Sequence, residues 1–155
     1  MGSPDGIIPV SEFQFQDRAI IPFRVQARTT RTLQEIEMST KLDEFRTYRT
    51  RMNNRIGQID HLGIKRFFNL DTNAYKDGAL DGKTKELLGL VASTVLRCND
   101  CVDYHLIQCV DAGWNDGELF DALNVALVVG GSIVIPHLRH AVETIDTLRS
   151  EHKGK

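Results

Sequence analysis

The sequence predicts an all-α protein, a compact bundle of about six helices. Three observations favour this class. Apolar residues recur at helical spacing from about residue 39 to residue 150, capping residues separate these stretches, and no stretch alternates like a strand between hairpin turns. With 155 residues, the chain is long enough to bury a real core. We therefore expect residues 38–155 to form one helical domain.

The first 37 residues differ in character from the rest. Met1-Gly2-Ser3-Pro4 resembles the start of a sequence added for protein expression, and Met38 stands just ahead of the first helical stretch. We expect residues 1–37 to be a leader or upstream segment; the alternative is a native extension.

The first three helices are predicted as follows. Apolar residues at helical spacing mark a first helix over residues 42–59 and a second over residues 63–75. Asp81 is the expected N-cap of a third helix that runs to about Arg97. This third helix is apolar nearly all round, so we expect it to be buried.

Three further helices complete the bundle. The fourth is expected to start with Asn99 or Asp100 as its cap and to end at Gly113. The fifth begins at a capping box over residues 115–118 and ends near residue 129. The last helix holds Pro136 in its first turns and ends by residue 150.

Composition excludes several classes of protein. The formal net charge is −2 and no basic cluster is present, which argues against binding of nucleic acid or anionic lipid. The longest apolar run, residues 125–135, is too short to span a bilayer, and no secretory signal is visible. Three cysteines, an odd number, favour the reducing cytoplasm over secretion.

Two of the cysteines form a Cys-x-x-Cys motif, Cys98-Asn99-Asp100-Cys101, at the predicted start of the fourth helix. Thiols at this spacing can close into a disulfide, and a helix N-terminus favours the thiolate, which is the reactive form. A thiolate can attack a disulfide or a peroxide oxygen, and the second cysteine then resolves the intermediate. The motif predicts thiol–disulfide redox chemistry.

His105 follows Cys101 by four residues, so the two share a helix face with Cβ atoms about 6 Å apart. An imidazole can accept or relay a thiol proton at physiological pH. The helix terminus alone favours Cys98 as the more reactive thiol, because Cys98 lies closer to the free N–H groups. The pairing with His105 favours Cys101, and we side with Cys101.

A structural zinc site is the main competing interpretation, because Cys98, Cys101, His105 and Cys109 are all zinc ligand types. On one straight helix Cys101 and Cys109 would lie about 12 Å apart along the axis, too far for one tetrahedral ion. We therefore expect no metal and no cofactor. Two buried, unreactive thiols are the other structural alternative.

The chain resembles a known family. Glu86, Cys98, Cys101 and His105 reproduce the E-x11-C-x2-C-x3-H signature of the alkylhydroperoxidase D-like proteins, in the carboxymuconolactone decarboxylase superfamily. The flanking sequence is also similar over about residues 42–148: Asp77-Gly78-Ala79-Leu80-Asp81, Lys83-Thr84-Lys85-Glu86, Asp111-Ala112-Gly113, Glu118, Ala122 and Val128-Val129-Gly130-Gly131.

The resemblance implies a helical fold that assembles into dimers, trimers or hexamers. It also implies peroxide reduction, or disulfide exchange with a thiol reductant or peroxiredoxin-type partner. By the same resemblance Cys101 is the activated thiol, Cys98 completes the disulfide, and Glu86 helps to deprotonate Cys101 with help from His105. The best-studied branch has a histidine where this chain has Asp100, whose charge would oppose thiolate formation unless it caps the helix.

Glu86 can also be weighed without the resemblance. It interrupts an apolar helix, where a buried carboxylate requires a hydrogen bond or a charged partner. If it is exposed instead, it would pair with Lys83. A straight helix would put Glu86 about 18 Å from Cys98, so either the chain bends back or a neighbouring chain brings them together.

Other residues rank lower as site candidates. We expect Cys109 to be a buried small hydrophobe and Trp114 to cover a helix junction. Tyr104 is expected to pack in the core or an interface, although it could hydrogen-bond near the site. His137 and His140 are expected to be ordinary residues of a polar face, although His137 could line a cavity.

Two other functions remain open. A decarboxylase or related lyase acting on a small lactone, which the superfamily name suggests, need not carry two catalytic thiols, so the intact motif counts against it. The second is a non-catalytic helical assembly module with idle cysteines. A homo-oligomer is expected under every interpretation, because the helices carry an excess of apolar surface.

Overall fold

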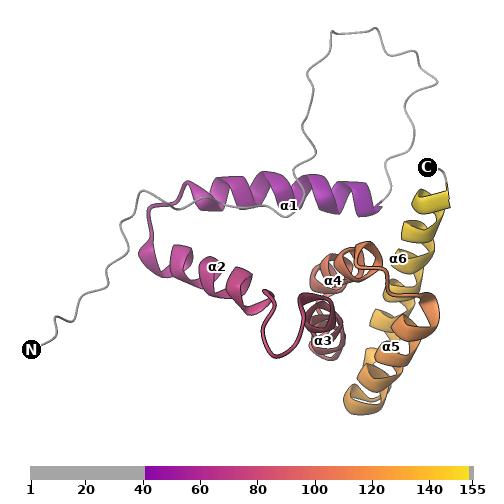
Figure 1. Cartoon of the computed structure of the whole chain (residues 1–155). Helices are drawn as coiled ribbons and strands as arrows, with labels where there is room; N and C mark the ends of the chain where they lie inside the picture. Colours follow the sequence, from indigo (N-terminus) through magenta and orange to yellow (C-terminus); the bar gives the residue numbers. More distant parts are fainter. Residues whose placement is uncertain (1–40, 154–155) are drawn as a thin grey trace, which may run out of the picture. The chain divides into compact units, whose positions relative to one another are not determined.

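This computed structural model describes residues 41–153, which fold into six α-helices and one short 3-10 helix (Figure 1). In chain order they are α1 (Lys41–Gly57), α2 (Leu62–Ala74), α3 (Gly82–Val95), α4 (Asn99–Asp111), α5 (Asp116–Gly130), η3 (Ser132–Val134) and α6 (Ile135–Lys153). These residues contain no strand, so the predicted all-α class is confirmed. The segment 1–37, expected to be a leader, lies outside the described residues.

Side-chain caps start two of the helices where the sequence predicts them. The Asp81 carboxylate accepts a hydrogen bond from the Thr84 N–H at 2.8 Å, at the N-terminus of α3. At the start of α5, Asn115 Oδ1 accepts from the Glu118 N–H at 3.1 Å, and Glu118 Oε2 accepts from the Asn115 N–H at 2.8 Å. This is the reciprocal pairing of a capping box.

The start of α4 differs from the prediction by one residue. Cys98, and neither Asn99 nor Asp100, is the N-cap residue, and its side chain makes no capping hydrogen bond. The Cys98 carbonyl accepts from the Val102 N–H at 2.9 Å, so helical bonding begins there. Asp100 therefore lies inside the first turn, and its exposed carboxylate is not used as a cap.

The turn before α4 explains this shift. α3 ends in a Schellman motif, in which the Arg97 N–H donates to Thr94 O and the Cys98 N–H to Ser93 O, both at 3.1 Å. Arg97 takes the left-handed conformation (φ 62°) that such a motif requires. The chain reverses direction within these residues, so α4 can begin directly at Cys98. At the end of α4 the equivalent left-handed position is Gly113 (φ 84°).

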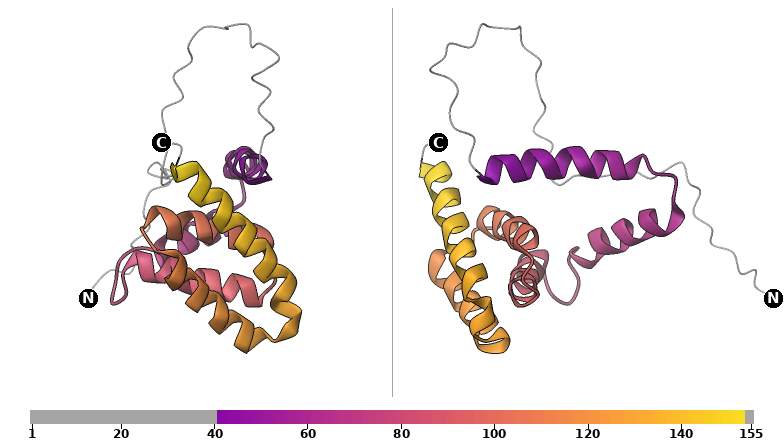
Figure 2. Two further views of the ribbon diagram at one scale, coloured as in Figure 1. Left: turned by 90° about the vertical axis from the view of Figure 1, so that its right-hand side faces the viewer. Right: turned by 180° about the vertical axis from the view of Figure 1, so that it is seen from behind.

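Four of the helices pack around a common core. α3 packs against α4 and α5, and α6 packs against the same two helices (Figure 2). The core consists of Leu90 of α3, Val102, Leu106, Cys109 and Val110 of α4, Leu119 and Leu123 of α5, and Ala141, Ile145 and Leu148 of α6, with Leu42 added from α1.

Apolar residues outside this core remain exposed. α2 has no buried residue, and α1 buries only Leu42. The expectation that α3 is buried all round is wrong for the single chain: Glu86, Leu90 and Thr94 are buried, but Leu88 is 54% exposed. The reason is that α4 and α5 cover only part of its circumference. None of the helices in residues 41–153 is long and apolar enough to cross a membrane.

Candidate active site

A buried hydrogen bond joins α3 to α4 through two of the predicted site residues. Glu86 Oε2 and His105 Nδ1 are 2.9 Å apart, and the two residues are only 5% and 7% exposed. The pairing of Glu86 with Lys83, considered from the sequence, does not occur. Because an ionised carboxylate only accepts hydrogen bonds, Nδ1 is the donor, which leaves Nε2 of the neutral ring as an acceptor. The chain bends back on itself, so one chain supplies both partners.

Cys98 and Cys101 are joined in a disulfide across the first turn of α4, with Cα atoms 5.2 Å apart. Both are partly exposed, in contrast to Cys109. The disulfide that the spacing of the two thiols allows is thus present in this structure. Cys101 and His105 line the same pocket, as expected of residues one helical turn apart.

This pocket has a volume of about 440 Å³, a size typical of small-molecule sites. Its walls come from three helices. They are Phe45, Tyr48, Arg49, Met52, Asn53 and Ile56 of α1, Asp71 and Tyr75 of α2 and its end, and Asp100, Cys101, Tyr104 and His105 of α4. Most of this surface is apolar or aromatic. The pocket therefore offers an organic molecule room beside the sulfur of Cys101.

Two tyrosines flank the histidine. The Tyr104 ring meets the His105 ring edge-on with centroids 5.2 Å apart, and the Tyr75 ring lies at 5.4 Å. Burial, and next the negative charge of Glu86, raise the pKa of both phenols, so both remain protonated donors. Arg49 places its guanidinium 4.1 Å from the centre of the Tyr104 ring.

The sequence interpretation missed Arg49 and Tyr75 and undervalued Tyr104. Tyr104 lies one residue before His105, which was a usable signal, but packing was favoured for its side chain over a hydrogen bond near the site. Arg49 and Tyr75 belong to no motif, because they reach the site only through the placement of α1 and the end of α2.

Cys109 is the free, fully buried thiol of α4. Burial, with a further contribution from the charge of Glu86, raises its pKa to about 12. It packs as a small hydrophobe, as the sequence predicts. Within residues 41–153 there is no group of three or more His, Cys, Asp or Glu side chains arranged to hold a metal ion.

A second buried polar cluster connects α4 to α6. Asp103 accepts hydrogen bonds from His140 Nε2 at 2.8 Å and from the Thr144 hydroxyl at 2.7 Å. The expectation that His140 is an ordinary polar-face residue is therefore wrong. His137 pairs with Asn99 at 2.7 Å. A nucleophilic hydroxyl would donate its hydrogen bond to a histidine that acts as base, but Thr144 donates to Asp103 instead. The cluster therefore connects α4 to α6 and has no arrangement for nucleophilic catalysis.

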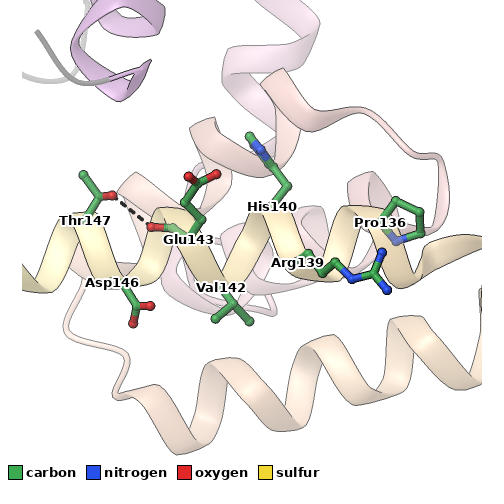
Figure 3. Close-up of a pocket in the computed structure, with 7 residues that line it drawn as sticks. All are labelled: Pro136, Arg139, His140, Val142, Glu143, Asp146 and Thr147. Carbon is green, nitrogen blue, oxygen red and sulfur yellow. Dashed lines mark hydrogen bonds between the residues drawn. The ribbon is translucent and has the colours of Figure 1, made fainter.

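A further hollow of about 660 Å³ lies along α6 (Figure 3). All of its lining residues belong to this one helix, and His140 and Glu143 leave the helix on a different side from Val142 and Asp146. These side chains do not converge on a common point. The pocket at Cys101 is therefore the better candidate for chemistry.

Fold and site together define a small helical protein in which a cysteine pair opens a helix beside a buried Glu–His pair. Comparison with known proteins agrees with this class. The carboxymuconolactone decarboxylase family model matches residues 64–144. The chain belongs to the carboxymuconolactone decarboxylase family.

Two solved structures show the similarity in detail. A family member from Thermotoga maritima, for which a role in an antioxidative response has been suggested, is 56% identical, with a TM-score of 0.69 over 72% of this chain and 94% of that chain. A family member from Legionella pneumophila is 27% identical, with a TM-score of 0.62 over 69% of this chain and 96% of that chain. An uncharacterized protein encoded in the cox locus of Paracoccus denitrificans is 26% identical over 53% of this chain and 74% of its own.

Proposed function

We propose that the protein is a cysteine-dependent peroxidase or disulfide reductase that works through Cys101 and Cys98. The observation that carries this proposal is the buried hydrogen bond between Glu86 and His105, which reaches the pocket that Cys101 lines. Such a pair holds one ring nitrogen of His105 and leaves the other to exchange a proton with a thiol.

The proposed cycle begins with the reduced pair. Nε2 of His105 takes the proton of the Cys101 thiol, and Glu86 stabilises the imidazolium that forms. The thiolate attacks a peroxide oxygen, an S–O bond forms, the O–O bond breaks, and the leaving alkoxide takes the proton from His105 to become an alcohol. The thiol of Cys98 then attacks the sulfenic acid of Cys101, and a disulfide and water are released.

An external dithiol completes the cycle. Its two thiols reduce the disulfide between Cys98 and Cys101 and are themselves oxidised to a disulfide, so electrons and protons balance. The disulfide of a peroxiredoxin-type partner could take the place of the peroxide: the thiolate of Cys101 attacks it and releases one partner thiol, and Cys98 then attacks the mixed disulfide and releases the second.

The pocket supports an organic oxidant. Its volume of about 440 Å³ and its aromatic and aliphatic walls suit the carbon skeleton of an alkyl or aryl hydroperoxide. The suggested antioxidative role of the 56% identical Thermotoga maritima protein points in the same direction. The alternative, a lyase acting on a small lactone, does not require Cys98. This alternative therefore predicts that Cys98→Ser keeps full lyase activity.

We also propose that the protein works as a homo-oligomer. Large apolar side chains are exposed on α2, α3, α5 and the following turn: Leu62, Phe67, Leu70, Leu88, Leu96, Phe120, Val125, Val128, Val129 and Ile133. So many exposed apolar residues in one small domain are typical of an interaction surface.

The proposed function is tested by adding an organic hydroperoxide to the reduced full chain. We expect both thiols of the pair to disappear, and the mass to fall by about two hydrogens, the change that disulfide formation requires. His105→Gln and Glu86→Gln should each slow this oxidation, whereas Ser150→Ala, an exposed change at the far end of α6, should not. Unchanged thiol content after exposure to peroxide would refute the proposal.

A further inference from the structure

Gly89 lies in the middle of α3, three residues after Glu86, and it is buried. A glycine inside a helix is less favourable than alanine, so its presence there calls for a reason in the packing. A Cβ atom built on Gly89 would lie 2.5 Å from Cε1 of His105 and 2.8 Å from each of its ring nitrogens. The imidazole thus occupies the space that any side chain at position 89 would need.

The imidazole lines the pocket with Cys101, but its other neighbours restrict how far it can move away from Gly89. Nδ1 is bonded to Glu86 at 2.9 Å, and the rings of Tyr75 and Tyr104 lie with their centroids 5.4 Å and 5.2 Å away. His105 is only 7% exposed. A methyl group on Gly89 must therefore displace the ring and with it the bond from Nδ1 to Glu86.

We propose that Gly89 is a positioning residue for His105: the absence of a side chain at position 89 lets the imidazole lie on α3 and reach Glu86. This inference rests on the proposed function only in linking His105 to the reactivity of Cys101. Gly89 itself touches no reacting atom. It acts through His105, because the ring can serve Cys101 from this place only while Glu86 fixes Nδ1.

The test uses the full chain with Cys98→Ser, so that Cys101 is the one reactive thiol of the motif; Cys109 is silent because its pKa is about 12. Gly89→Ala should slow alkylation and peroxide oxidation of Cys101 at neutral pH by about tenfold or more, and His105→Ala should do the same. Proton NMR should show loss of the low-field Nδ1–H signal of the bond to Glu86. Gly63→Ala, which places a methyl group against the exposed ring of His61, the N-cap residue of α2, should change neither measurement.

Comparison with His105→Ala separates positioning from general helix packing. Once the imidazole is gone, Gly89→Ala should stabilise the protein through its higher helix propensity and leave thiol reactivity unchanged. If Gly89→Ala alone fails to fold, recovery of folding in the double variant supports the contact. Equal destabilisation in both backgrounds, or a retained Nδ1–H signal with the wild-type pH profile of alkylation, overturns the inference. If His105→Ala leaves the reactivity of Cys101 unchanged, the proposed proton relay is wrong. The Nδ1–H signal of Gly89→Ala then tests by itself whether Gly89 positions the ring.

Discussion

Cys98 and Cys101 differ in their surroundings, and we propose that this difference gives them different roles in the reaction. Cys98 is the N-cap residue of α4, whereas Cys101 lies one turn further in and lines the pocket with His105. We expect the lone Cys101 of Cys98→Ser to be alkylated at lower pH than the lone Cys98 of Cys101→Ser, because an imidazole accepts its proton. Rates of alkylation as a function of pH measure this directly. The opposite order would mean that the helix terminus outweighs the histidine.

The charge of Asp100 should limit the reactivity of Cys101. Asp100 is exposed, makes no capping bond and lines the same pocket, so its negative charge disfavours the neighbouring thiolate. We expect Asp100→Asn to raise the rate of thiol oxidation at neutral pH by roughly twofold to tenfold. Asp121→Asn, on α5, is the matched control. An unchanged or lower rate for Asp100→Asn would show that solvent screens this charge completely.

Sequence reasoning reached the site residues that follow a fixed spacing and missed those that tertiary packing brings in. The interval between Cys101 and His105 is one helical turn, so their shared face could be predicted from the sequence. The meeting of Glu86 and His105 depends on the reversal between α3 and α4, which spacing alone does not determine. Arg49 and Gly89 have no local signal at all, since their roles exist only in contacts with Tyr104 and His105.

In the turn from α3 to α4, the left-handed backbone conformation of Arg97 lowers the stability of the fold. A residue with a side chain at φ 62° costs roughly 1–2 kcal/mol, and glycine gives back roughly 0.4–1 kcal/mol through the extra freedom of the unfolded chain. We therefore expect Arg97→Gly to stabilise the fold by about 0.5–1 kcal/mol, measured by urea unfolding of the oxidised protein.

The end of α4 provides the reciprocal control. Gly113 has φ 84°, and an added Cβ would meet nothing within 4 Å, so Gly113→Ala changes only the backbone preference. It should destabilise the protein by about 0.5–1 kcal/mol, because the reduced freedom of the unfolded chain offsets part of the strain. If both substitutions moved stability in the same direction, backbone conformation would not be their common cause.

The start of a helix could be predicted from the sequence where a local side-chain cap determines it. Asp81 and the pair of Asn115 and Glu118 satisfy backbone N–H groups within one turn, and the sequence locates them correctly. The first residue of α4 was misplaced, because the geometry of Arg97 in the preceding turn determines it. The exposure of Leu88 was also missed. The sequence of an apolar helix does not show whether its own chain or another copy of the chain covers its surface.

For the whole molecule, the exposed apolar residues predict assembly. We expect sedimentation to show an oligomer at micromolar concentration. Val128→Glu, which puts a charge on a residue that is 77% exposed on α5, should shift the protein towards smaller species without unfolding the chain. Ser150→Glu near the end of α6 serves as the control for added charge. A stable wild-type monomer would contradict the prediction.

Stability should fall at alkaline pH. In the folded chain Cys109 keeps its proton up to a pKa of about 12, whereas the unfolded chain releases it near 9.0. Deprotonation therefore favours the unfolded state, and the contribution of Cys109 is complete below pH 9.0 and is lost as the pH rises towards 12. The raised pKa values of Tyr75 and Tyr104 act in the same direction.

Urea midpoints of the oxidised protein, measured from about pH 8 to about pH 11, should show this loss. Cys109→Ala should have a lower midpoint near neutral pH, because it leaves a small cavity, but a shallower decline with pH. Parallel declines for the two proteins would show that another group controls the alkaline transition.

The bridge between Cys98 and Cys101 spans three positions of the chain. In the loop-entropy treatment such a short ring restricts the unfolded chain by only about 2 kcal/mol, against almost 5 for a ring of a hundred residues. We therefore predict that reduction of this pair leaves the bundle folded and changes only the first turn of α4. If only this turn changes, a reductant would have to recognise the oxidised form at the sulfur atoms of Cys98 and Cys101 themselves.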